Sequence, residues 1–183
     1  MATGTRSAEN FAKSVGFCCG LVIAWESRFS PQDIIEMATI ITFFLAGLAV
    51  GTLVEYLLHR FLLHSRLRHR IIRRHKMHHK THVRHSIVSE FLGFFPGVVP
   101  FLWVGFAHNT SAGVAFVVGE LVYVLAVAVA HKWSHEAPHR LFWMNPVVHD
   151  LHHDGRSRWN YGVVTSFWDR VFGTYTTSRK STN

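Results

Sequence analysis

The sequence contains only two cysteines in 183 residues, and they lie side by side at Cys18 and Cys19. Neighbouring cysteines rarely pair with each other, so no disulfide framework is expected. Two thiols are also too few for a cysteine-based zinc module or an iron–sulfur cluster. No G-x-G-x-x-G stretch occurs, so this fingerprint of a nicotinamide or flavin site is missing. Redox chemistry in this chain would therefore need other metal ligands and an outside source of electrons.

Acidic residues are scarce as well, since 11 Asp and Glu compare with 19 Lys and Arg, for a formal net charge of +8. The positive charge is unevenly placed: nine of the 19 basic residues lie between His59 and Glu90, and seven more follow His131. A nucleic-acid surface is one interpretation of the basic run. Basic loops beside apolar segments have a plainer explanation in membrane topology, so we expect no nucleic-acid partner.

Charged residues are almost absent from three long segments. Residues 37–58 contain only Glu55, residues 113–130 contain only Glu120, and residues 91–107 contain none. A transmembrane helix needs roughly 20 predominantly apolar residues, which the first two segments supply. The third contains Pro96, Gly97 and Pro100, and membrane helices tolerate such residues where neighbouring groups satisfy the backbone. We predict that all three segments span a bilayer.

A fourth apolar segment, residues 14–25, is shorter. It fits a tilted span, a re-entrant segment or the core of a signal peptide, and the lack of a small-x-small cleavage site favours a retained span. Lys and Arg concentrate in cytoplasmic loops, so the N-terminus, the basic block 59–90 and the tail from His131 are expected on the cytoplasmic side. The predicted fold is a single all-α integral membrane domain over residues 1–183. It has about four transmembrane helices, a cytosolic histidine-rich helical cap and both termini in the cytoplasm.

Ten of the histidines fall into four tight clusters, two of which begin where an apolar segment ends. The clusters are His59 and His64; His75, His78 and His79; His131 and His135; and His149, His152 and His153. Imidazole is the commonest protein metal ligand, and histidines three or four residues apart share a helix face. Ten ligands are too many for one ion and about right for two.

The spacing also predicts how the clusters divide. Adjacent histidines diverge by roughly 100° around a helix axis, so one can serve one ion and its neighbour another. The five-residue step from His59 to His64 needs the helix to end or bend near Phe61, or two different ions. The remaining histidines are expected to be ordinary surface or core residues: His69, His82, His85, His108 and His139.

The ligand type indicates the metal. Structural zinc sites close at four ligands and prefer cysteine or mixed sets. Five imidazoles per ion leave room for an exogenous ligand, which suits iron and oxygen chemistry better. We therefore expect two iron ions with O2 as co-substrate, although zinc can occupy such a site in a purified sample.

The C-terminal part carries the most specific motifs, His149-Asp-Leu-His-His-Asp154, Asn160-Tyr-Gly162 and Phe167-Trp-Asp-Arg-Val-Phe-Gly-Thr-Tyr175. With the histidine clusters, they resemble the fatty acid hydroxylase / sterol desaturase superfamily over residues 55–176. The resemblance implies a membrane-bound, non-haem di-iron oxygenase with a cytosolic histidine cap on four spans. It also implies that the ten clustered histidines are the metal ligands.

Several residues near the clusters are candidates for supporting the ligands. Metal-bound imidazoles usually donate their other N–H to a carboxylate or carbonyl, which makes Asp150 and Asp169 candidates. Glu55 lies one turn before His59, where it would bond an imidazole or pair with an arginine of the cap. Two further candidates, Asn160 and Tyr161, come from the C-terminal motif.

The favoured function is an O2-dependent hydroxylase acting on a C–H bond of a bilayer lipid, such as a fatty acyl, sphingolipid or sterol-like molecule. The alternatives are a lipid desaturase or carotenoid hydroxylase with the same centre, and a non-enzymatic membrane metal-binding or transport protein. Electrons are expected from an external carrier, cytochrome b5 or a ferredoxin with its reductase. An acidic carrier would be steered to the basic cap around Arg66 to Arg84.

Overall fold

The computed structural model describes residues 29–81, 86–154 and 158–178. The chain divides into two compact units, residues 1–40 and 41–183. Every regular element in the described ranges is a helix, which confirms the all-α class. The predicted span at 14–25 lies outside the described residues.

Helix α2 (Pro31–Leu57) starts with a reciprocal cap. The backbone N–H of Asp33 donates to Ser30 Oγ at 3.2 Å, and that of Ser30 donates to Asp33 Oδ2 at 2.7 Å. This arrangement satisfies backbone donors that the first turn of a helix leaves free. The long apolar run that follows then stays helical through Leu57.

A π-helical turn, η1 (Leu58–Leu63), continues α2 and explains the five-residue histidine step. A π-helix closes i→i+5 hydrogen bonds, so residues five apart come to the same face. His59 and His64, at the start and just beyond the end of this turn, have ring centroids 5.2 Å apart. The wider turn thus brings the two imidazoles together.

Two helices in the described ranges are long and apolar enough to cross a membrane. They are Pro31–Leu63, which combines α2 with η1, and α5 (Thr110–Glu136), with 33 and 27 residues. Asn109 caps α5 by accepting the Ala112 N–H at 2.8 Å. These helices contain the predicted spans at 37–58 and 113–130.

The predicted span at 91–107 is a bent segment rather than one straight helix. Its pieces are α4 (Ile87–Phe94) and the 3-10 turns η2 (Phe95–Gly97), η3 (Val99–Phe101) and η4 (Gly105–Ala107). Prolines in the first turns of η2 and η3 prevent a continuous α-helix, and the two halves meet at 46°. The described residues therefore hold two candidate spans, or three if the bent pair is one span. The total of four and the sidedness stay predictions.

Two glycines let α2 and α5 cross at close range. A Cβ on Gly47 would lie 2.2 Å from the Phe116 carbonyl oxygen, and one on Gly119 would lie 2.2 Å from the Phe44 carbonyl oxygen. No side chain fits at either position, so the backbones contact each other, as at small-residue interfaces of membrane helices. The crossing fixes the relative position of the two helix ends that carry His59 and His131.

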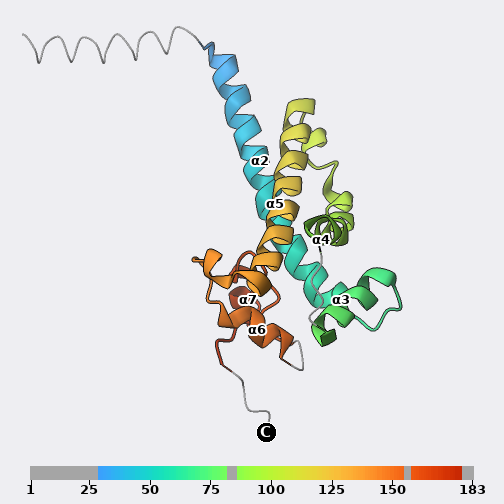
Figure 1. The fold of residues 1–183 in the computed structure, drawn as a ribbon. Helices are drawn as coiled ribbons and strands as arrows, with labels where there is room; N and C mark the ends of the chain where they lie inside the picture. The colour runs from blue at the N-terminus through green and yellow to red at the C-terminus, as the bar shows by residue number, and fades with distance from the viewer. Residues whose placement is uncertain (1–28, 82–85, 155–157, 179–183) are drawn as a thin grey trace, which may run out of the picture. The chain divides into compact units, whose positions relative to one another are not determined.

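The buried core surrounds the C-terminal half of α5. It contains Leu63, Phe94, Val98, Tyr123, Val124, Val127, Ala130, Leu141 and Val163. The other helices of this unit are α3 (Arg70–Thr81), η5 (Pro138–Arg140), α6 (Val147–His153) and α7 (Phe167–Val171). Figure 1 shows α6 and α7 at the C-terminal end of α5, with α3 following the end of α2. The helices that carry histidines therefore meet at one end of the α2–α5 pair.

Candidate metal centre

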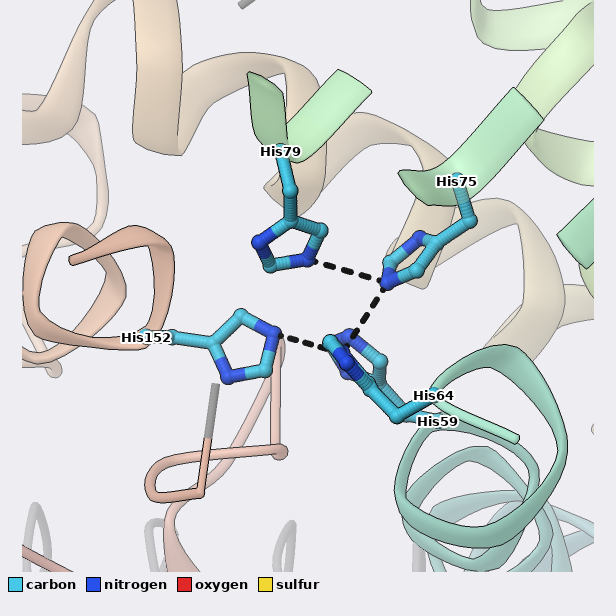
Figure 2. A group of neighbouring side chains, drawn as sticks. All are labelled: His59, His64, His75, His79 and His152. Atoms are coloured by element: carbon cyan, nitrogen blue, oxygen red, sulfur yellow. Dashed lines mark hydrogen bonds between the residues drawn. The ribbon is translucent and has the colours of Figure 1, made fainter. Parts of the chain in front are cut away.

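The ten clustered histidines come together in two sets of five. One set consists of His59, His64, His75, His79 and His152, and the other of His78, His131, His135, His149 and His153. Within each set the candidate ligand nitrogens all lie within 4.8 Å of one another. Figure 2 shows the first set, with imidazoles from three parts of the chain pointing toward a common centre. Both sets are thus arranged as metal sites.

Each histidine triplet is divided between the two sets. On α3, His75 and His79 belong to the first set and His78 to the second; on α6, His152 belongs to the first, and His149 and His153 to the second. This division follows from helical geometry, because neighbouring side chains diverge while those four apart share a face. The rings of His79 and His153 stack across the sets, with centroids 4.1 Å apart. The two sets are therefore immediate neighbours.

The nitrogen separations fit a bound metal better than hydrogen bonding. Nε2–Nε2 distances are 3.1 Å for His64–His75, 3.0 Å for His75–His79, 3.2 Å for His64–His152, 3.1 Å for His78–His131 and 2.9 Å for His135–His149. One Nε2 carries either a proton or a lone pair, so that of His64 cannot bond two others at once. Two nitrogens at right angles around an ion, each about 2.1 Å from it, would be about 3.0 Å apart. The buried Nε2 of His59 has no hydrogen-bond partner among the described residues.

Burial keeps these imidazoles in the neutral form that binds metals. It lowers the pKa of His64 to about 4 and that of His79 to about 3. Burial, reinforced by neighbouring histidines, also lowers the pKa of the following residues: His75, His149, His152 and His153. A neutral imidazole has a free lone pair, so no proton has to be displaced when an ion binds.

Main-chain carbonyls orient two histidines of the first set. His59 Nδ1 donates to the Tyr161 carbonyl at 2.5 Å, and His152 Nδ1 donates to the Trp159 carbonyl at 2.7 Å. A proton held on Nδ1 leaves Nε2 as the ligand atom, which is the usual arrangement around a metal. Both carbonyls belong to the segment that contains the Asn160-Tyr-Gly motif. The motif thus contributes backbone oxygens to the site.

A carboxylate that the sequence analysis missed orients a histidine of the second set. Glu90 on α4 accepts His131 Nδ1–H at 2.8 Å, and Arg74 on α3 lies 3.8 Å from its other oxygen. Arg74 also donates to the Ser89 carbonyl at 2.6 Å, which ties α3 to α4. The signal available in the sequence was an acid directly before the uncharged segment 91–107, where a carboxylate needs a partner.

Asp169 supports the first set through the backbone. Its carboxylate accepts the N–H groups of Tyr161 and Gly162, both at 2.8 Å, and Thr174 Oγ1–H at 2.7 Å. These bonds hold Tyr161 in place, and the Tyr161 carbonyl accepts the hydrogen bond from His59. A Cβ on Gly162 would lie 2.0 Å from the Thr165 carbonyl oxygen, so the bend closes only around glycine. Burial raises the pKa of Asp169, while its hydrogen bonds oppose that shift.

Asn160 stabilises the same segment from within. It adopts a φ of 56°, and its side chain donates to the carbonyls of Val148 and Thr176, both at 3.0 Å. Its Oδ1 accepts the Thr176 N–H at 2.8 Å. Asparagine tolerates this left-handed conformation better than most residues do. Asn160 therefore links α6, which carries three histidines, to the C-terminal segment at Thr176.

The remaining candidates lie elsewhere. Glu55 accepts Tyr123 Oη–H and the Val163 N–H, both at 2.6 Å, rather than an imidazole or an arginine. It therefore joins α2, α5 and the C-terminal segment. Asp150 is exposed on α6, and its expected bond to a histidine stays a prediction.

Of the five histidines expected to be ordinary residues, the three in the described ranges, His69, His108 and His139, belong to neither set. His108 stacks on Phe43 with ring centroids 5.3 Å apart. His69 and His139 are exposed, whereas His82 and His85 lie outside the described residues.

Replacing Glu90 by glutamine should weaken metal binding in the second set by about 10- to 100-fold, the range for groups that hold a metal-bound histidine. The amide oxygen still accepts His131 Nδ1–H but no longer carries the charge. Metal content after equilibration with a graded chelator should then fall from two ions per chain toward one. Glu136→Gln, which removes an exposed carboxylate paired with Lys132, is the matched control. Equal metal retention in both variants would contradict the role of Glu90.

Known proteins are similar to this chain in sequence and in fold. Residues 44–174 match the profile of the family described as Fatty acid hydroxylase. The chain is 31% identical to the fatty acid 2-hydroxylase of Rattus norvegicus over 154 residues, which cover 77% of this chain and 41% of that protein. It is 28% identical to the dihydroceramide fatty acyl 2-hydroxylase of Arabidopsis thaliana over 167 residues, covering 86% and 70%.

A solved structure supports the fold. The chain titled "Full length scs7p (only hydroxylase domain visible)" matches with a TM-score of 0.56 and 24% identity, covering 84% of this chain and 64% of that one. The chain spans about two fifths of the length of the rat relative. The profile match covers well over half of the sequence and includes all ten clustered histidines. The chain therefore belongs to the fatty acid hydroxylase family, within the fatty acid hydroxylase / sterol desaturase superfamily.

Proposed function

We propose that the protein is an O2-dependent membrane hydroxylase that converts a C–H bond of a lipid acyl chain to C–OH. The observation that carries this proposal is the pair of five-histidine sets at one end of two membrane-length helices. Such a donor set leaves room for an exogenous ligand and favours iron. The ten histidines are the proposed ligands of two iron ions.

The division of labour follows from the donor set. When bound, the two ferrous ions would supply the reduction of O2 and the oxidising power needed to break an unactivated C–H bond. The overall reaction is R–H + O2 + 2e⁻ + 2H⁺ → R–OH + H2O. The chain itself holds ten imidazoles in place, and Tyr161, Trp159 and Glu90 fix the tautomers of three of them.

The substrate class is inferred from the relatives and the surroundings of the site. The relatives' names specify fatty acids and the fatty acyl chain of dihydroceramide, oxidised at carbon 2. We infer a fatty acyl substrate for this chain, free or in a sphingolipid. Phe142, Trp143 and Phe167 are exposed next to the histidine-bearing helices, where they suit contact with the acyl region of a bilayer. The acyl chain would then enter sideways from the membrane.

The location and the electron source belong to the same proposal. The basic residues between His59 and Glu90 support a cytoplasmic position for the histidine sets and both termini. The two electrons would come from an external carrier such as cytochrome b5 or a ferredoxin with its reductase. Purified protein should then turn over only when carrier and reductase are added to NAD(P)H.

Lipid mass spectrometry under 18O2 tests the function. Cells expressing the chain should gain a hydroxylated acyl lipid that contains one labelled oxygen, and cells expressing His79→Ala should not. Loss of two hydrogens without added oxygen would instead indicate a desaturase. Labelled carotenoid without labelled acyl lipid would indicate a carotenoid hydroxylase. Bound metal with no change in any lipid would favour a metal-binding or transport protein.

A further inference from the structure

A basic pocket lies outside the two histidine sets, between the segment that follows η1 and the outer face of α3. Its volume is about 410 Å³, within the range of roughly 300–1,000 Å³ typical of small-ligand sites. Six of its lining residues are cations: Arg66, Arg68, Arg70, Arg73, Lys76 and Lys80. Among the described residues, none that lines the pocket is acidic. The pocket is therefore a concave site of strongly positive potential.

The charge of this pocket is not compensated within the described part of the chain. The ion pairs recorded there join Arg74 to Glu90, His131 to Glu90 and Lys132 to Glu136, and none of them includes a pocket cation. The first turn of α3 contains no acidic residue either. Cations gathered in one concave site repel each other, and a bound anion would relieve that repulsion. The pocket is thus electrostatically prepared for an anion.

Apolar side chains in the same pocket indicate what kind of anion it takes. Leu67 is 63% exposed and Met77 is 49% exposed, and both line the pocket. The candidate span Pro31–Leu63 ends three residues before Arg66. Cations next to exposed apolar side chains at the end of a membrane helix match the boundary between phosphate headgroups and acyl chains.

We propose that this pocket binds the phosphate-bearing headgroup of an anionic phospholipid from the surrounding bilayer. The arginines would bind phosphate oxygens, to which the planar guanidinium can donate two parallel hydrogen bonds. Leu67 and Met77 would pack against the first carbons of the acyl chains. An acidic electron carrier was expected on this surface, but an interface with a protein needs about 800 Å² per partner, and a concave pocket suits a small anion.

Arg74 lies outside this pocket. Although it lies beside Arg73 in the sequence, its guanidinium donates to the hydroxyl and carbonyl of Ser89 and does not line the pocket. Arg73 is exposed in the pocket. Variants of Arg68 and Arg73 therefore test lipid binding without removing a group that holds α3 to α4.

Native mass spectrometry of the full chain in detergent tests the proposal. Dioctanoyl phosphatidic acid should bind at least tenfold more tightly than dioctanoyl phosphatidylcholine, and rising salt should reduce the difference. The variant Arg68→Gln/Arg73→Gln should bind phosphatidic acid roughly 30-fold more weakly, since each cation near an anionic lipid surface contributes a factor of about five. The matched control Lys132→Gln/Arg140→Gln removes two charges elsewhere and should bind as the unchanged protein does.

Two further measurements distinguish a loss of lipid binding from a loss of folding. The salt-dependent preference is measured on the unchanged protein, so it stands even if a variant folds poorly. Metal content and the thermal midpoint without lipid show whether the pocket variant is folded, and neither depends on turnover. Equal affinity for both lipids, equal losses in both variants, or equally tight binding of inorganic phosphate would overturn the proposal. Unchanged lipid binding with slower carrier-dependent turnover would overturn it too and assign the surface to the carrier.

Discussion

Replacement of His152 by alanine is expected to remove one of the two metal ions and to lower hydroxylation at least about 100-fold. The side chain is fully buried, its Nε2 lies 3.2 Å from that of His64, and its Nδ1 is fixed by the Trp159 carbonyl. Groups that only orient a ligand change metal affinity by about 10- to 100-fold, so loss of a ligand should exceed that range. Metal per chain and hydroxylated lipid per chain measure the two effects.

His108→Ala is the control for this prediction. The His108 ring stacks on Phe43, and His108 belongs to neither histidine set. We expect two ions per chain and unchanged turnover in that variant. A fully active His152→Ala protein with two bound ions would remove His152 from the ligands. A protein that keeps two ions but loses turnover would place its role in the reaction rather than in metal binding.

The histidine spacing predicts much of this centre because helical geometry is simple. Histidines four apart share a helix face and adjacent ones diverge, so the triplets on α3 and α6 divide between the two sets. The position of His64 relative to His59 is harder to predict from the sequence, because an α-helix does not bring residues five apart to the same face. The π-helical turn η1 supplies that alignment, and no residue type in the segment predicts a π-helix.

The groups that orient the histidines could not be derived in the same way. Two of them are carbonyls, at Trp159 and Tyr161, and every residue has a carbonyl. Glu90 is 41 positions before His131, so only the packing of α4 against α5 shows their contact. Conversely, Glu55 lies one turn before His59, yet its bonds go to Tyr123 and Val163. Proximity in sequence thus indicates the ligands better than it indicates their supports.

The same difference applies to the candidate membrane spans. The length of the apolar runs was enough to predict α5 and the helix Pro31–Leu63. A continuous apolar run in a bilayer forms a helix because a helix satisfies its own backbone N–H and C=O groups. The segment 91–107 has the same composition but is broken into short 3-10 turns, because its prolines cannot donate helical hydrogen bonds. The composition of a segment indicates how favourably it transfers from water into lipid. The path of its backbone depends on which residues can donate helical hydrogen bonds.

Replacement of Asp169 by alanine is expected to destabilise the protein by about 3–5 kcal/mol, the range for removing one partner of a buried charged network. Three donors, the N–H groups of Tyr161 and Gly162 and the Thr174 hydroxyl, would lose their acceptor in a buried environment. Each unsatisfied buried donor costs about 1–3 kcal/mol. Thermal unfolding in detergent and metal content measure the two consequences.

Asp150→Ala separates the two carboxylates that the sequence made equal candidates. Asp150 is exposed, so its loss should change the unfolding free energy by no more than about 0.5 kcal/mol. Asp169→Asn keeps the shape of the side chain but replaces one acceptor oxygen with a donor, so it should lie between the two alanine variants. Because Asp169 holds Tyr161, whose carbonyl receives His59, metal affinity measured below the unfolding transition should fall in both Asp169 variants. Unchanged affinity in a destabilised Asp169→Asn protein would confine Asp169 to a structural role, and equal stability of the Asp150 and Asp169 alanine variants would contradict the hydrogen-bond network itself.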